Sequence, residues 1–488
     1  MRNLLVLAIL VFFVPYFIIG FNTDASVYAY MGKLVADGGV PYIDGWDHKG
    51  ISMYLINAIG YLVLGFKSFS GIRILELILI FIGFLQFFNY WKRQSSSLIA
   101  LIAGIFGLFT LRYFFEEGNV TEEYALILSL LSALLLLKQK TRTFDYALVG
   151  AFFVICFTIR ANLIAFWIAL FLVYIIQLIL KQKTIKEVLL NFVKMGYGSV
   201  AISAVLLLYM SVTGSFNAFI DAAFTFNFSY TDSSSSGSTL VAIFTIMKRY
   251  HLSVILVIGF LVSLLRFYKD RSRFLELLLL LWIPIELYLG NISHRIYAHY
   301  FLMWVPLILF SVGVTLLEIK ERFKLSQIKL ILASGAVFVL CYYVPLFLSF
   351  KDYQKVLTSS EIKGNLVVDH IRENYPDQSL LVWGNACHVY NDLGITSPIR
   401  FFYQSTLKYD TEIMRAQSKE FTEQVAEKKP RLIIDTRRNS YLALDKSNSD
   451  EVGSGYVKNL SGFLDIIATD YQIKERKFGM VFYELKNE

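Results

Sequence analysis

The sequence predicts an α-helical protein that crosses a membrane many times and ends in a smaller soluble α/β domain. Of its 488 residues, 56% are hydrophobic and only 17% are charged, and the mean hydropathy is +0.55. These values are typical of a chain whose solvent is mostly lipid. Apolar runs of membrane length recur over the first 350 residues, and from about Lys351 mixed charges and turn residues replace them.

The first apolar run, Leu4 to Gly20, carries no charge and could be mistaken for a secretory signal. Many similar runs follow it, so we expect it to be a retained span. Short charged turns separate about 11 predicted transmembrane helices, at residues 4–20, 71–91, 97–114, 122–137, 144–159, 161–180, 192–213, 251–266, 274–290, 299–317 and 328–350.

The apolar stretch Ile51 to Phe66 is short for a span, and counting it would invert the topology of all that follows. If it lies at the interface, most Lys and Arg residues fall on one set of alternating loops. Positive residues stay on the cytoplasmic side. We therefore expect a multi-pass protein of the cell membrane with a cytoplasmic N-terminus and a first outer loop at 21–70. The net charge of +8 then needs no nucleic acid to explain it.

The predicted domains are a membrane domain at 1–350 and an extracytoplasmic α/β domain at 351–488. The second is expected to contain helices and strands at Ser360–Glu373, Ser379–Trp383, Asp410–Lys429 and Arg431–Asp435, with a final helix and hairpin after Val457. Its aromatic and imidazole side chains at Trp383, His388, Tyr390 and Tyr403 could stack on sugars or pack in a core.

Acidic and basic residues converge on the predicted outer face. The first loop holds Asp24, Asp47, His48 and Lys49, and later loops hold acids beside Glu122 and basic residues from Arg160 onward. A carboxylate can act as general base on a hydroxyl, while Lys and Arg stabilise a departing phosphate. The same inventory would serve a proton-coupled transporter.

The order of these residues resembles the GT-C membrane glycosyltransferases. Asp24 follows the first span, YAYMGKLVADGGVPYIDGWDHKG comes next, and Gly71 and Arg73 form a Gly-x-Arg motif after an apolar stretch. The chain looks most like glycosyltransferase family 39, the bacterial relatives of protein O-mannosyltransferases and lipid A aminoarabinose transferases. In that family a long outer loop carries the catalytic acid, and amphipathic helices lie on the membrane.

The resemblance assigns roles to two first-loop residues. Asp24 matches the family's general base, although an acid at this position could also simply cap the helix that follows. Lys49 matches the lysine that pairs with the lipid phosphate, and an interfacial snorkelling lysine is the alternative. The family motif continues Lys-Pro-Pro, whereas this chain has Gly50 and Ile51.

Four later residues complete the expected site. Glu122 matches the second catalytic acid. The alternative is that this carboxylate is there only because the helix dipole stabilises a negative charge at a helix N-terminus. Arg160 matches a basic residue at a break between spans, while Arg295 and His299 match a basic, Tyr-bearing segment. All three are expected to contact the donor phosphate.

No cofactor is certain from the sequence. Asp47 and His48, together with His299, are weak candidates for a divalent metal, which some relatives hold near this place. No spacing resembles a closed zinc site.

The resemblance implies an inverting glycosyltransferase that moves a hexosyl or pentosyl group from a polyprenyl-phosphate donor to a cell-envelope glycan, lipid or protein. The reaction would take place among membrane lipids on the outer face of the membrane. Two alternatives stay open: a transporter or flippase of lipid-linked glycans, and an envelope scaffold or sensor acting through the exported domain.

Overall fold

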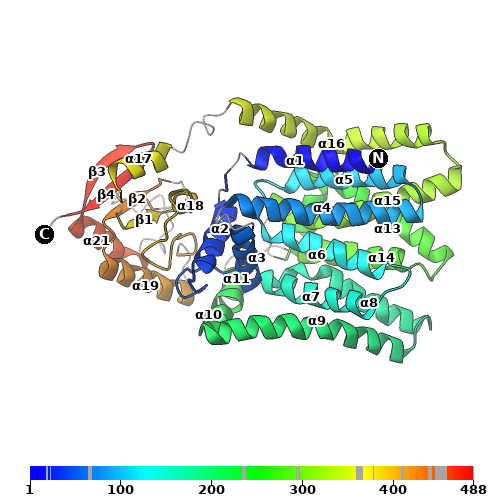
Figure 1. Cartoon of the computed structure of the whole chain (residues 1–488), viewed down its shortest axis with the longest axis horizontal. Helices are drawn as coiled ribbons and strands as arrows, with labels where there is room; N and C mark the ends of the chain where they lie inside the picture. Colours follow the sequence, from blue (N-terminus) through cyan, green and yellow to red (C-terminus); the bar gives the residue numbers. More distant parts are fainter. Residues whose placement is uncertain are drawn as a thin grey trace. The chain divides into compact units, whose positions relative to one another are not determined.

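The computed structural model describes residues 1–17, 20–21, 23–63, 69–232, 238–292, 294, 297–358, 366–376, 378–407, 411–437, 442–445 and 459–486. It is mostly helical (Figure 1) and forms two compact units. The helical unit comprises Met1–Ile18, Arg73–Tyr209 and Ser236–Thr358. The composite unit comprises Ile19–Ile72, Met210–Ser235 and Ser359–Glu488. The composite unit is therefore built from three separate stretches of the chain. The domain boundary expected at 350/351 stays a prediction.

Helices run through every segment where a span was predicted. They are α1 (Arg2–Phe13) with η1 (Val14–Phe17), α4 (Phe69–Gln94), α5 (Ser97–Phe114), α6 (Thr121–Leu136), α7 (Thr143–Ile159), α8 (Ala165–Ile179), α9 (Ile185–Val212), α13 (Ser253–Lys269), α14 (Phe274–Leu289), η5 (Ala298–Met303) with α15 (Trp304–Phe323), and α16 (Gln327–Thr358). The short helix α12 (Thr239–Arg249) was not predicted.

Several of these helices can cross a membrane by length and composition. Among the described residues four qualify, namely Phe69–Gln94, Ser97–Phe114, Ile185–Val212 and Ala298–Phe323, and the last is the most buried of the four. Helices α12 and α13 pass the same test together but meet at a bend of 107°. The other apolar helices are shorter. The chain is thus a membrane protein, and the count of about eleven spans stays a prediction.

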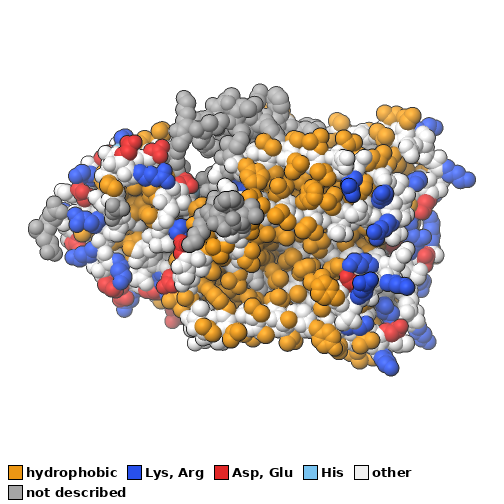
Figure 2. Space-filling model, viewed as in Figure 1, with side chains coloured by type: hydrophobic (Ala, Val, Ile, Leu, Met, Phe, Trp, Pro, Cys, Tyr) orange, Lys and Arg blue, Asp and Glu red, His pale blue; other side chains and the backbone are white. Residues whose placement is uncertain are grey.

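Basic side chains gather at one end of the helical unit, on the right in Figure 2, while its flanks are largely hydrophobic. Lys92 and Arg93 lie in the last turn of α4, and Lys320 and Arg322 lie in the last turn of α15. This is the end that the sequence assigns to the cytoplasm. The asymmetry agrees with that assignment, which itself remains a prediction.

In the composite unit the first loop folds into two helices, α2 (Thr23–Ala36) and α3 (Ile51–Leu62). Helix α3 occupies the stretch expected to form a short interfacial helix. The chain passes so close to α3 where α4 begins that a side chain at Gly71 would collide with the carbonyl oxygen of Gly60. Close packing therefore explains why the Gly-x-Arg motif has a glycine at this position.

A second part of the composite unit, between α9 and α12, was not foreseen in the sequence. It contains α10 (Phe216–Ile220), a π-helical turn at Asp221–Thr225 and α11 (Phe226–Asp232). Such turns are rare and frequently occur at functional sites.

The C-terminal part contains the predicted elements. They are α17 (Leu366–Asn374), β1 (Leu380–Trp383), α19 (Glu412–Lys428), β2 (Leu432–Asp435), α21 (Ser461–Asp470), β3 (Tyr471–Lys477) and β4 (Met480–Leu485). A further helix, α18 (His388–Leu393), was not predicted. The sheet order is β1-β2-β4-β3. Strands β1 and β2 are parallel, so their connection crosses over through α18 and α19, whereas β4 is antiparallel to both neighbours.

Two of the four side chains suggested for sugar stacking belong to the core instead. Trp383 and Tyr390 are fully buried. The Trp383 indole N–H donates to the carbonyl of Leu442 (2.7 Å), and the Tyr390 hydroxyl accepts from the amide of Val382 (2.7 Å). Sugar stacking is therefore wrong for these two. His388 is partly exposed at the start of α18.

Candidate functional site

Lys49 lies in a turn held by tyrosine hydroxyls. Tyr42 has a left-handed φ of 69°, and its amide donates to the carbonyl of Gly45 (2.8 Å). The Tyr42 hydroxyl donates to the Lys49 carbonyl (2.8 Å), and the Lys49 amide donates to the Tyr54 hydroxyl (3.1 Å). Gly50 then adopts an extended conformation as the N-cap of α3. The backbone of Lys49 is thus fixed without the prolines of the family motif.

Asp47 is buried beneath this turn, with 1% of its surface exposed. Its carboxylate accepts hydrogen bonds from the hydroxyls of Tyr54 (2.7 Å) and Tyr403, and Nδ1 of His48 lies 3.3 Å away. Burial acts to raise the pKa of Asp47, but His48, Lys49 and the Tyr403 hydroxyl overcome it and hold the pKa below its usual range. Asp47 is therefore a stable anion.

His48 connects Asp47 to Lys49. Its Nε2 lies 2.7 Å from the Lys49 ammonium, a pure donor, so the contact assigns Nε2 as the acceptor. Burial, followed by the charge of Lys49, lowers the pKa of His48, which is consistent with a neutral ring. Asn227 on α11 holds the turn by donating to the His48 carbonyl (2.8 Å). The Lys49 ammonium also lies 5.8 Å from the Tyr28 ring centroid.

Asp24 lies near this cluster, in the first turn of α2. It is partly exposed, unlike Asp47. Its negative charge contributes to the pKa values of His48 and Tyr403, after burial and closer groups. The composite unit therefore holds a partly exposed carboxylate near the histidine that contacts Lys49.

The helical unit brings together two other predicted residues. Glu122, in the first turn of α6, is 2% exposed, and its Oε1 lies 2.6 Å from Nη1 of Arg160 at the break after α7. The Thr121 hydroxyl donates to the other Glu122 oxygen (2.7 Å). The Arg160 guanidinium lies 4.5 Å from the Tyr300 ring centroid. This stacked ion pair explains an arginine at a break with almost no loop.

His299 lies beside this pair in η5. Its ring centroid is 5.0 Å from that of Tyr300, and its Nδ1 is 3.1 Å from Oε2 of Glu116. Arg295, the remaining predicted phosphate ligand, falls outside the described residues.

A second buried carboxylate group in the helical unit was not identified from the sequence. Arg73 pairs with Glu76 (3.0 Å), and the Asn119 amide donates to Glu76 and to Glu123 (2.8 Å). Asn119 has a left-handed φ of 51°, and the Tyr124 hydroxyl donates to its side chain (2.9 Å). The sequence feature that could have identified this group is Glu76, an acid in an otherwise apolar helix.

The metal candidates are a poor fit. Nε2 of His48 already faces an ammonium, and the oxygens of Asp47 accept tyrosine hydroxyls. In the part of the chain that the structure describes, no three His, Cys, Asp or Glu side chains cluster as metal ligands.

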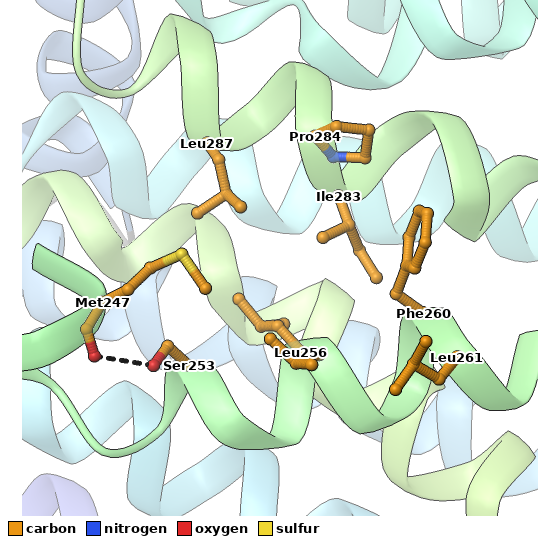
Figure 3. Close-up of a pocket in the computed structure, with 9 residues that line it drawn as sticks. Met247, Ser253, Leu256, Phe260, Leu261, Ile283, Pro284 and Leu287 are labelled. Atoms are coloured by element: carbon orange, nitrogen blue, oxygen red, sulfur yellow. Dashed lines mark hydrogen bonds between the residues drawn. The ribbon is translucent and has the colours of Figure 1, made fainter. Parts of the chain in front are cut away.

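An apolar pocket of about 170 Å³ lies among α12, α13 and α14 (Figure 3). Its walls include Met247, Leu256, Phe260, Ile283 and Leu287, and the Ser253 hydroxyl is turned to the Met247 carbonyl (2.8 Å). Such a lining suits hydrocarbon rather than a sugar or a phosphate.

Neither a protein-family model nor a curated protein matches this chain. Solved structures do. ArnT from Cupriavidus metallidurans in the apo state has a TM-score of 0.60 at 12% identity, and the same protein bound to undecaprenyl phosphate has 0.58 at 13%. Each match covers 99% of this chain and 97% of ArnT. An Archaeoglobus fulgidus oligosaccharyltransferase gives 0.46 at 11% identity, covering 88% of this chain and 67% of that one. The chain therefore has the GT-C fold seen in ArnT.

Proposed function

We propose that this protein is an inverting glycosyltransferase that uses a polyprenyl-phosphate sugar donor and glycosylates a cell-envelope acceptor on the outer face of the membrane. The observation that carries the proposal is that a partly exposed acid, Asp24, lies near His48, whose ring contacts a lysine with a fixed backbone. The fold supports it, because ArnT has a structure bound to undecaprenyl phosphate.

In this proposal Asp24 accepts the proton of the acceptor hydroxyl as its oxygen attacks the anomeric carbon. The bond to the phosphate oxygen breaks in the same displacement, which inverts that carbon. By resemblance, Lys49 and Arg160 are assigned to stabilising the negative charge that develops on the leaving phosphate. Arg295 and His299 are assigned to the same phosphate by resemblance.

Glu122 has a narrower role than a second free acid. Its carboxylate pairs with Arg160 and accepts from Thr121, so we assign it to orienting the guanidinium over Tyr300. The apolar pocket between α12 and α14 is a candidate contact for part of the polyprenyl chain.

The test is mass spectrometry of envelope glycans and polyprenyl-phosphate sugars from cells that carry the wild type, a deletion, Asp24→Asn or the control Asp37→Asn. Asp37 lies beyond the other end of α2, where it pairs with Lys33 (2.7 Å). We expect the deletion and Asp24→Asn to lose one sugar decoration and to accumulate its lipid donor, while Asp37→Asn remains normal.

Other outcomes separate the rival functions. A flippase would leave the lipid-linked sugar on the cytoplasmic leaflet in the deletion strain. A scaffold would tolerate Asp24→Asn. If Asp24→Asn leaves the glycans unchanged while the deletion alters them, the assignment of Asp24 as base is wrong.

A further inference from the structure

The segment that follows α18 packs directly on the first loop. The Tyr30 ring stacks on Phe402 at a centroid distance of 4.0 Å, and the Tyr30 hydroxyl accepts from the amide of Ser397 (2.9 Å). The Asn391 side chain donates to the Ser26 carbonyl (2.9 Å). These contacts join α2 to the C-terminal part through both rings and backbone.

This packing brings Tyr403 onto Asp47. The Trp46 amide donates to the carbonyl of Arg400 (2.8 Å), so the chain just before Asp47 runs against the chain just before Tyr403. Tyr403 then donates to Oδ1 of Asp47, while Tyr54 from α3 donates to Oδ2 (2.7 Å). One carboxylate is thus held from two sides.

The held carboxylate has a consequence for Lys49. With Asp47 fixed as an anion, Nδ1 of His48 faces a negative oxygen and is the ring nitrogen that best carries the proton. Nε2 is then an acceptor and receives the Lys49 ammonium. The polar contacts form a chain from Tyr403 through Asp47 and His48 to Lys49.

We infer that Tyr403 is a positioning residue that sets the tautomer of His48 and thereby the place of the Lys49 ammonium. This inference rests on the proposed function, because the lysine matters as a phosphate ligand. The inference also gives the C-terminal part a role in the site, because the Tyr403 side chain completes the hydrogen bonds that hold the first loop. The same support from a second layer of side chains is common at metal sites and typically affects affinity 10- to 100-fold.

Three variants test it in the full-length protein. Tyr403→Phe and Tyr54→Phe each remove one hydroxyl from Asp47. Tyr390→Phe is the matched control, because this tyrosine is equally buried in the C-terminal part but its hydroxyl serves the amide of Val382. Thermal unfolding shows whether each variant folds.

The first readout is the NMR signature of the His48 ring in protein with isotope-labelled histidine, assigned by His48→Gln. It reports the tautomer and needs no activity. The second readout is the Kd for undecaprenyl phosphate. We expect Tyr403→Phe and Tyr54→Phe to shift the His48 ring signals and to raise this Kd about tenfold, and Tyr390→Phe to change neither.

Unchanged His48 signals in folded Tyr403→Phe would overturn the inference. If Tyr403→Phe does not fold, Tyr54→Phe tests the same carboxylate from the other side. If the His48 signals shift but the wild type does not bind undecaprenyl phosphate, the positioning stands and the proposed function fails. Equal effects in Tyr390→Phe would reduce the role of Tyr403 to general packing and would also overturn the inference.

Discussion

Arg160 in the helical unit is neutralised by a carboxylate, whereas Lys49 in the composite unit rests against a neutral imidazole. The Glu122 and Arg160 pair places opposite charges 2.6 Å apart, with Glu122 almost fully buried. Lys49 contacts His48 at 2.7 Å, and the balancing anion, Asp47, is one residue further away and engaged by tyrosines. Arg160 thus contacts a carboxylate, and Lys49 contacts a ring that lies next to one.

The difference separates stability from binding. A directly paired, buried carboxylate loses much when its partner is removed, because its charge is left without compensation. A lysine beside a neutral ring leaves no orphaned charge behind.

Removing the accessible carboxylate should have the largest effect. Asp24→Asn should lower the transfer rate about 10²- to 10⁴-fold, because a general base contributes that much, while undecaprenyl phosphate binding persists. The assay combines purified protein, the lipid-linked sugar accumulated by the deletion strain and that strain's envelope fraction as acceptor. Asp37→Asn should behave as wild type. Turnover of Asp24→Asn near the wild-type rate would contradict the mechanism.

Breaking the direct pair should reduce stability, in addition to removing a proposed phosphate contact. Arg160→Ala leaves Glu122 buried and charged, and we expect a loss of about 2 to 3 kcal/mol, less than for a fully buried pair because Arg160 is 21% exposed. The measurement is the unfolding midpoint of the purified protein. The double variant Glu122→Gln with Arg160→Gln should recover part of the loss. A double variant less stable than Arg160→Ala would argue against this reasoning.

Removing the Lys49 ammonium should mainly affect binding. Lys49→Ala should raise the Kd for undecaprenyl phosphate about 10- to 30-fold and shift the unfolding free energy by less than about 1 kcal/mol. Lys33→Ala, on α2 in the same unit, is the control because its ammonium pairs with Asp37. A large loss of stability without a change in Kd would make Lys49 a structural residue.

The His48 ring should make the stability of the protein modestly dependent on pH. Because the pKa of His48 is lowered in the folded protein, the unfolded chain binds more protons below about pH 6.5. Its contribution to stability is therefore present above that pH and is lost as the pH falls. The wild type should lose free energy of unfolding between pH 7 and pH 5.5, and we expect this loss to be about 1 kcal/mol smaller in His48→Gln. The measurement is the free energy of unfolding of both proteins at both pH values.

Much of the helical architecture was predictable because lipid exposure leaves a strong signal. Uninterrupted apolar runs bounded by charged turns located every predicted span within a helix, and α3 matches the expected short helix. In the C-terminal part, strand and helix periodicity located β1, β2 and α19 within a few residues. Helices α10 to α12 were missed because polar and apolar residues mix there without a clear period.

The site was only partly predictable. Resemblance pointed to Glu122 and Arg160, and the structure joins them, but no sequence pattern reveals that a carboxylate and a guanidinium 38 residues apart will pair. Tyr403 was considered only as a sugar-stacking or core residue. Its contact with Asp47 depends on how the sheet region packs against the first loop, which is a property of the whole fold. Glu76, by contrast, could have been flagged as an acid in an apolar helix.

The separation of Tyr403 from Asp47 along the chain has a consequence for biogenesis. The two residues are 356 positions apart, yet one hydrogen bond links them. At a synthesis rate of about 5 to 20 residues per second, roughly 20 to 70 seconds pass between their emergence from the ribosome. During that time the first loop lacks its aromatic partners and the helices can insert with the site unfinished. The Asp47 framework is therefore complete only after Tyr403 has emerged, and chains that stop before this residue would insert into the membrane without that contact.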